Sequence, residues 1–251
     1  MRKWNIGLLV LLMAMGASAS YVQAEGFTVD NEFSSKYMWR GFDLFDDHGA
    51  WMPSVDFELA EGWGLNVWSA QPFGSGNQKG VEYDYTLSFS NTINEGETDE
   101  VEYSVGYIMY QFPNKNDLNA NEIGIGFSFP SALSGGDLPL VPSVYLGKFE
   151  GDGGAYYSFR LDWEVECPDT GQVFGVYGDV AYNDGMGTYE NSAGDEFDIG
   201  SDLSHVSFGI STDVEIMDIS ISPFVNYQMS LEDTINSDDE LWAGFSTSIT
   251  F

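Results

Sequence analysis

Alternation of apolar and polar residues, sustained through about twelve segments of roughly ten residues, is the feature that most restricts how this chain can fold. Such a period-two pattern predicts β-strands with two chemically different faces, because successive side chains of a strand point to opposite sides. Aromatic residues make up 16% of the chain and Gly numbers 29, which also favours strands and turns over helices. The predicted strands are 27–39, 51–60, 63–70, 81–91, 101–110, 121–129, 140–149, 155–166, 173–182, 205–214, 219–228 and 241–251.

Charged residues keep to one phase of the strongest segments. In 155–166 the apolar side chains alternate with Arg160, Asp162 and Glu164, and segments 27–39, 51–60 and 81–91 behave in the same way. A charge on the lipid-facing side of a membrane strand costs up to roughly 2–4 kcal/mol. The pattern therefore favours a membrane β-barrel with an apolar exterior and a polar interior. An exported soluble β-sandwich, with the apolar phase in a dry core, is the alternative.

The two ends of the chain agree with export to an outer membrane. Arg2 and Lys3 precede the apolar run 6–15, which is too short for a membrane helix and predicts a signal peptide over 1–24, cleaved after Ala24. Cleavage after Ala19 is the alternative to cleavage after Ala24. Residues 25–251 are then the mature barrel. Its last strand ends on Phe251, which resembles the C-terminal signal that the barrel-assembly machinery reads.

Connection lengths support an antiparallel up-and-down transmembrane β-barrel of about 12 strands. Long polar links (40–50, 71–80, 111–120, 183–204, 229–240) alternate with links that include the very short 61–62 and 215–218. The phase of 140–149 is ambiguous, because Val144 and Leu146 share one face while Tyr145 and Phe149 share the other; counts of 10 or 14 stay open. We expect aromatic girdles at the membrane interfaces, formed by Trp39, Trp51, Trp63 and Trp163.

The chain is strongly acidic. It has 8 basic and 40 acidic residues, a net charge of −32, which excludes nucleic acid and other polyanions as partners. Such a negative charge either keeps the protein soluble in a salty habitat or creates an electrostatic field that attracts cations.

If the charged phase faces inward, it lines a lumen. The predicted lining residues are Asp30, Glu32, Lys36, Asp56, Glu58, Glu82, Asp84, Arg160, Asp162 and Glu164, and Glu102, Glu122, Asp179 and Asp213 extend this set. Acidic side chains in a confined pore attract cations. Lys36 and Arg160 either neutralise buried carboxylates or create a transverse field across the pore, whereas Arg40 is expected to anchor a loop.

A more specific signal lies in residues 34–72. There Pro53 and Gly62-Trp63-Gly64 follow the segment Ser35-Lys36-Tyr37-Met38-Trp39-Arg40-Gly41-Phe42. This order resembles the start of the TorF-type putative porin family, whose first hairpin bears an S-x-Y-x-(W/F)-R-G segment before a Pro-containing strand and a Gly-aromatic-Gly turn. The resemblance implies a small outer-membrane channel of unsettled substrate. The heavy acidity of this chain departs from the family.

Enzymatic and metal sites are weaker interpretations. His205 and Ser207 have the H-x-S spacing of outer-membrane phospholipase A, but the phase turns both inward, away from a lipid substrate. The acidic loop 183–204 lacks the ligand spacing of a known calcium loop, and Cys167 has no second cysteine in the chain to pair with. We expect no catalytic residue, metal or cofactor.

The function expected from these patterns is passive diffusion of small polar or cationic solutes through a narrow channel. The alternative is a non-conducting structural barrel, and a lipid hydrolase is a further one. The expected partners are outer-membrane lipid and lipopolysaccharide, the assembly machinery through Phe251, and the solutes.

Overall fold

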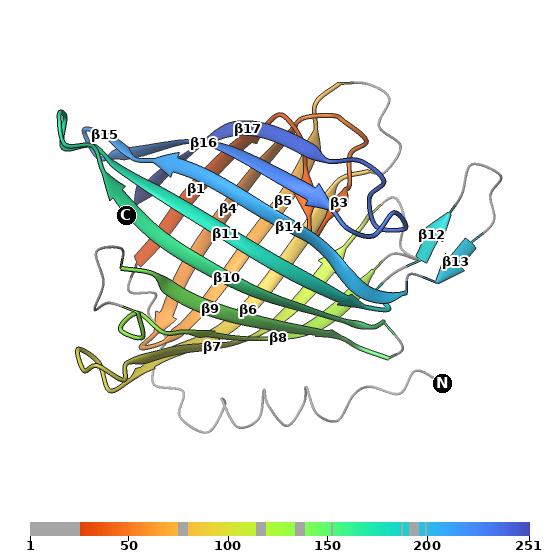
Figure 1. Cartoon of the computed structure of the whole chain (residues 1–251), viewed down its shortest axis with the longest axis horizontal. Coiled ribbons are helices and arrows are strands. Elements are labelled where there is room, and N and C mark those ends of the chain that lie inside the picture. Colours follow the sequence, from red (N-terminus) through yellow and green to blue (C-terminus); the bar gives the residue numbers. More distant parts are fainter. Residues whose placement is uncertain are drawn as a thin grey trace.

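The protein is a closed antiparallel β-barrel of twelve long strands (Figure 1). The computed structural model describes residues 26–74, 80–113, 119–133, 139–151, 153–186, 188–190, 196–198 and 200–251, so the predicted signal peptide lies outside the described residues. The long strands are β1 (Gly26–Ser34), β4 (Ala50–Ala60), β5 (Trp63–Pro72), β6 (Glu82–Ile93), β7 (Val101–Gln111), β8 (Ala120–Ser128), β9 (Val141–Phe149), β10 (Ala155–Glu166), β11 (Val173–Asp184), β14 (Ser201–Thr212), β16 (Ile219–Ser230) and β17 (Glu240–Thr250).

Each long strand pairs with its neighbours in sequence, and β1 closes the ring against β17. At this seam Phe251 and Phe27 bond each other's backbone and stack their rings 4.9 Å apart. Short strands complete the topology: β2 (Met38–Trp39), β3 (Phe42–Asp43), β12 (Thr188–Glu190), β13 (Glu196–Asp198) and β15 (Val214–Ile216). The predicted fold class and strand count are confirmed, and the counts of ten and fourteen are wrong.

Connections differ in length between the two ends of the barrel. The links after β1, β5, β7, β11 and β16 gather at one end, called here the loop end, together with the short link between β9 and β10. The opposite end carries the remaining turns, the first residue of β1 and the last residue of β17. There the turn between β4 and β5 needs Gly62, which has a φ of 74°, and an added Cβ would lie 2.4 Å from the Ser90 carbonyl oxygen.

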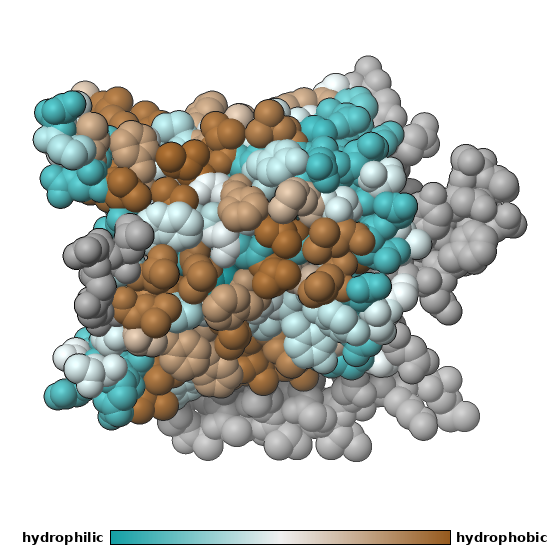
Figure 2. Space-filling view, in the orientation of Figure 1, coloured by the Kyte–Doolittle hydropathy of each residue, from teal (hydrophilic) through white to brown (hydrophobic). Residues whose placement is uncertain are grey.

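The outer surface is apolar across the middle of the barrel and hydrophilic at both ends (Figure 2). Large apolar side chains are exposed there on alternate strand positions, including Ile123, Phe159, Phe208, Val225 and Phe245. In water this band would be unfavourable, whereas lipid covers it at no such cost. No helix among the described residues is long and apolar enough to cross a membrane.

This exterior yields a direct prediction. Phe208 lies on the outer face near the middle of β14 and is 47% exposed, so Phe208→Lys should lower the free energy of unfolding in lipid vesicles by about 2–4 kcal/mol. Phe208→Leu, which keeps the site apolar, is the control. Equal stability of the two variants in urea titrations would contradict a lipid-facing surface.

The first strand departs from its predicted bounds. Alternation suggested a strand through residue 39 with Tyr37 and Trp39 outward, but β1 ends at Ser34. The chain then turns inward, Tyr37 is 5% exposed within the barrel, and Trp39 packs on Tyr110 and Phe149 from the opposite wall. The assignment of Trp39 to an interfacial girdle is therefore wrong.

Candidate pore and its inward hairpin

A short hairpin, formed by β2 and β3, enters the barrel at the loop end (Figure 1). Its two-residue turn consists of Arg40 and Gly41, which have φ values of 52° and 97°. Positive φ at both central residues is the type I′ geometry, which Gly adopts freely but which costs a residue such as arginine about 1–3 kcal/mol. The base of the hairpin is closed by a hydrogen bond of 3.0 Å from the Leu44 N–H to the Tyr37 carbonyl.

Apolar clusters hold the hairpin on both sides. On one side Tyr37 and Phe45, 5% and 2% exposed, pack against inward residues of β4 and β5 such as Met52. On the other side Trp39 and Phe42 pack against a second cluster that includes Phe149. The hairpin therefore bridges opposite walls and narrows the lumen at this level.

Polar contacts fasten the hairpin tip to the far wall. The Arg40 guanidinium lies 2.7 Å from the Glu122 carboxylate, and the two side chains are 10% and 0% exposed. Glu122 also accepts hydrogen bonds from the Tyr110 hydroxyl at 3.0 Å and the Tyr145 hydroxyl at 2.5 Å. Arg40 is thus the loop anchor that the sequence predicted, and its anchor point is inside the barrel.

Aromatic rings surround the same guanidinium. The Arg40 Cζ lies 4.7 Å from the ring centre of Tyr156 and 4.9 Å from that of Trp39, with Tyr145 and Phe149 at 5.5 and 5.6 Å. Cation–π contacts of this kind strengthen when the cation is desolvated. The ambiguous phase of 140–149 has its explanation here, because Tyr145 and Phe149 face inward to meet the hairpin.

Two further contacts hold the hairpin, one at its base and one at its tip. The Tyr37 hydroxyl donates to Glu82 on β6 at 3.0 Å, and the Gln228 amide donates to the Gly41 carbonyl at 2.9 Å. Glu82 and Gln228 are each 2% exposed. The hairpin is therefore tied to β6, β8 and β16, strands on different sides of the ring.

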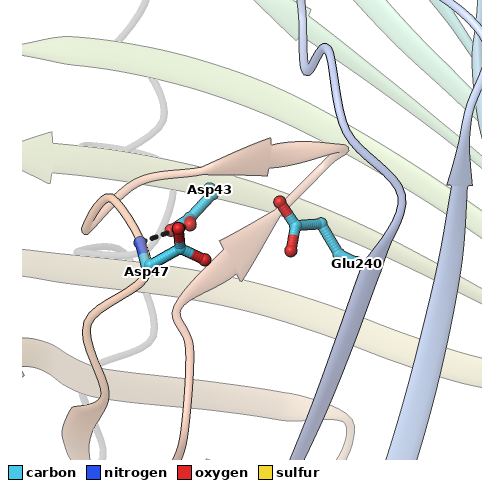
Figure 3. A group of neighbouring side chains, drawn as sticks. All are labelled: Asp43, Asp47 and Glu240. Carbon is cyan, nitrogen blue, oxygen red and sulfur yellow. Dashed lines mark hydrogen bonds between the residues drawn. The ribbon is translucent and has the colours of Figure 1, made fainter.

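Three carboxylates meet beside the hairpin: Asp43, Asp47 and Glu240 (Figure 3), with oxygens within 4.8 Å of one another. The Lys36 ammonium binds both Asp47 and Glu240, so a cation of the chain itself already neutralises this group. Burial alone lowers the pKa of Lys36, but these hydrogen bonds outweigh burial and raise it. The hydrogen bond from Lys36 lowers the pKa of Asp47. The cluster is an anchor of the loop.

The strand residues predicted to line the lumen alternate with outward apolar side chains, as expected. Asp30, Glu32, Asp56, Glu58, Glu82, Asp84, Arg160, Asp162 and Glu164 all lie at such positions, whereas Lys36 follows the end of β1. Arg160 pairs with Asp162 at 2.7 Å and stacks on Tyr177 at 3.9 Å. That these residues line a conducting pore stays a prediction.

Part of this site was not predicted from the sequence. Glu240 and the inward rings of Tyr110, Tyr145 and Tyr156 were not assigned to it. The signal that identifies these rings is an aromatic residue on the otherwise polar phase of a strand.

The interior contains cavities on the far side of the hairpin from the loop end. The larger, about 620 Å³, is lined mainly by inward residues near the turn end, with hydroxyls from Ser90, Thr92, Ser104, Ser128 and Ser143. A smaller one, about 220 Å³, lies directly beneath the hairpin tip against β10, β11, β14, β16 and β17. The lining of the larger cavity thus combines several hydroxyls with the carboxylates of Glu95 and Glu102.

The candidate hydrolase residues also lie inside the barrel. His205 and Ser207 are 4% and 5% exposed, while Phe208 beside them faces outward. The His205 ring bonds the Ser204 hydroxyl at 2.8 Å, but Ser204 is 0% exposed. Neither serine is open to a substrate in the lipid phase.

The remaining candidates are only partly described. In the loop 183–204 the Asp184 carboxylate accepts a hydrogen bond from Ser201, whereas residues 191–195 and the side chains of 188–190 and 196–198 lie outside the description. Cys167 is a free thiol in the turn between β10 and β11.

The contact between Arg40 and Glu122 depends on a glycine. A Cβ at Gly147 would lie 2.2 Å from Glu122 Oε1 and 3.1 Å from Arg40 Nη1, so Gly147→Ala should displace this ion pair and weaken the hairpin's anchorage. We expect faster proteolytic cleavage within residues 35–49 in the folded protein. Gly106→Ala is a matched control, since its nearest neighbour atom is 3.7 Å away. Equal cleavage of the two variants would contradict the proposed anchor.

Comparisons with known proteins agree on the fold. Models of known protein families give no match, and no curated protein sequence matches the chain. Among solved structures, the KdgM porin matches with a TM-score of 0.56 at 9% identity, covering 89% of this chain and 99% of that one. The NanC porin matches with a TM-score of 0.53 at 9% identity, over 89% and 98% of the two chains.

An outer membrane channel from Pseudomonas putida F1 matches with a TM-score of 0.51 at 10% identity, over 93% of this chain and 98% of that one. At such low identity these likenesses show a shared fold, that of porin-like outer-membrane barrels. With the apolar exterior described above, this fold places the protein in the bacterial outer membrane.

Proposed function

We propose that the protein is a narrow outer-membrane channel for passive diffusion of small polar or cationic solutes, with the β2–β3 hairpin as its constriction. The observation that carries the proposal is a pair of interior cavities, lined largely by hydroxyl and charged side chains, that persist beneath the anchored hairpin. The resemblance to the TorF-type family supports the same class of function.

Charge favours cations as the solutes. Among the described residues, Lys36, Arg40 and Arg160 are the basic side chains within the barrel, and each is paired with a carboxylate. Asp56 and Asp84 face inward with no such basic partner in the described part of the chain. The field in the lumen is therefore negative, and a low-dielectric wall concentrates it.

Planar-bilayer recording of the purified mature chain tests this function. We expect discrete conductance steps and a cation-selective reversal potential under a KCl gradient. Asp30→Asn should reduce the selectivity, because it removes an inward carboxylate of β1. Asp218→Asn, at an exposed turn outside the lumen, is the control with the same change of charge. Anion selectivity in the wild-type channel would contradict the proposed role of the lumen.

A non-conducting structural barrel is the second candidate. It is favoured by the burial of Tyr37 and Phe45, which leaves little open space at the level of the hairpin. Stable insertion without conductance steps would select it.

The proposed partners follow from the position of the protein. Membrane lipid covers the apolar band, lipopolysaccharide meets the loop end, and Phe251, 66% exposed at the seam, serves recognition by the assembly machinery. The proposed function requires no enzymatic chemistry.

A further inference from the structure

The smaller cavity, called here the Asp179 cavity, lies at the middle of the barrel. Its walls include Arg160, Tyr177, Asp179, His205, Gln228 and Trp242, and the hairpin tip forms its ceiling. Its volume is about 220 Å³. One water molecule occupies about 30 Å³ of liquid, so the cavity accepts an organic molecule of several heavy atoms.

Most of the charges around this cavity are already paired. Arg40 is bound to Glu122, and Arg160 bonds both oxygens of Asp162 at 2.7 to 2.9 Å. Arg160 lies opposite Asp179 in the strand register, yet its guanidinium turns to Asp162 instead. Each arginine thus forms a neutral unit with its own carboxylate.

Asp179 is the exception. Its side chain is 13% exposed, and no hydrogen bond to its carboxylate occurs among the described residues; the His205 Nε2 lies 3.7 Å away, beyond hydrogen-bond length. His205 directs its other ring nitrogen to Ser204. A mostly buried carboxylate without a donor is costly, so a ligand that supplies a donor and a positive charge is favoured here.

The cavity also offers an apolar contact. The ring of Tyr177 is covered by Arg160 at 3.9 Å, whereas Trp242 contributes its ring to the wall. An indole surface binds methylene groups and attracts cations over its face. Asp179 and Trp242 together suit an ammonium group on a short carbon chain.

We propose that the Asp179 cavity is a binding subsite for small primary-ammonium compounds on their path through the lumen, a step that rests on the proposed channel function. The ammonium donates to the Asp179 carboxylate and the carbon chain lies against Trp242. Divalent metal ions are disfavoured because they require several oxygen ligands and the cavity offers one carboxylate. Anions are disfavoured by the charge of Asp179 itself.

Butylammonium chloride is the probe, added to the reconstituted mature protein in a planar bilayer with KCl on both sides. We expect brief, concentration-dependent interruptions of the potassium current. Asp179→Asn should raise the half-blocking concentration about tenfold, which corresponds to about 1.4 kcal/mol. Asp56→Asn removes an inward carboxylate outside this cavity and should change it less than twofold. Unchanged block in Asp179→Asn overturns the subsite and leaves the channel function intact.

A second variant tests the contact with Trp242, and a second measurement distinguishes failure of the subsite from failure of the channel function. Trp242→Leu should weaken block by butylammonium while leaving block by methylammonium unchanged, and equal effects on both overturn the contact with the ring. Calorimetric titration of the detergent-purified protein does not depend on conduction. If the wild type fails to conduct but binds butylammonium, and Asp179→Asn does not, the subsite stands and the channel function fails. Absence of binding by the wild type overturns the subsite.

Discussion

Excision of residues 38–43, with Tyr37 joined to Leu44 by two glycines, should raise single-channel conductance several-fold. The Tyr37 carbonyl and the Leu44 N–H are already hydrogen-bonded at 3.0 Å, so a two-residue link spans the gap without disturbing the rest of the loop. The excision removes the Trp39, Arg40 and Phe42 side chains that bridge the lumen. Current recordings at equal salt concentration measure the effect.

A milder variant keeps the hairpin but removes its contact with the barrel wall, so it distinguishes the effect of the hairpin's presence from the effect of its attachment. Arg40→Asn places Asn-Gly in the type I′ turn, the pair that this turn prefers, so the hairpin keeps its shape but loses its contact with Glu122. We expect a noisier channel with more frequent transitions to a higher conductance. Lys148→Gln removes a positive charge from the outside of the barrel and is the matched control. If excision leaves conductance unchanged, the hairpin does not constrict the pathway.

Loss of Glu122 should have the largest effect on stability. Its side chain is 0% exposed and pairs with Arg40, so Glu122→Ala leaves a guanidinium in a largely buried site without its counter-charge. Removal of one partner of a buried ion pair costs about 3–5 kcal/mol. Urea titration in lipid vesicles, followed by tryptophan fluorescence, measures the loss in the free energy of unfolding.

A double-mutant cycle tests the origin of that cost. In Arg40→Asn/Glu122→Ala the unpaired guanidinium is absent, so the double variant should recover much of the stability lost by Glu122→Ala alone. Additive losses would show that Glu122 acts through its bonds to Tyr110 and Tyr145 instead.

The barrel itself was predictable because membrane strands obey a strict rule. Lipid disfavours charge on the outward face of a strand, so the two-phase pattern predicted most of the strands and a count of about twelve, which the structure confirms. Segment 155–166 is an example: predicted Phe159 outward and Arg160 inward agree with β10.

The hairpin was not predictable by the same rule. Tyr37 and Trp39 continue the apolar phase of the first strand, so alternation alone extends that strand past Ser34. Their apolar surface is covered by protein inside the barrel rather than by lipid outside it. Hydrophobicity does not distinguish these two kinds of cover, although the Arg40-Gly41 pair is compatible with a turn.

The sequence by itself determined an antiparallel membrane barrel of about twelve strands, because the two-residue period within each strand already separates an apolar face from a polar one. Only the tertiary structure decided which inward carboxylates are paired with a cation of the chain and which have no hydrogen-bond donor among the described residues. Three carboxylates form ion pairs with basic side chains that lie two to more than two hundred residues away in the sequence: Glu122, Glu240 and Asp162. Asp179, in contrast, has no hydrogen-bond donor among the described residues. Such pairings depend on how the ring closes and where the hairpin enters it, and no local pattern encodes them.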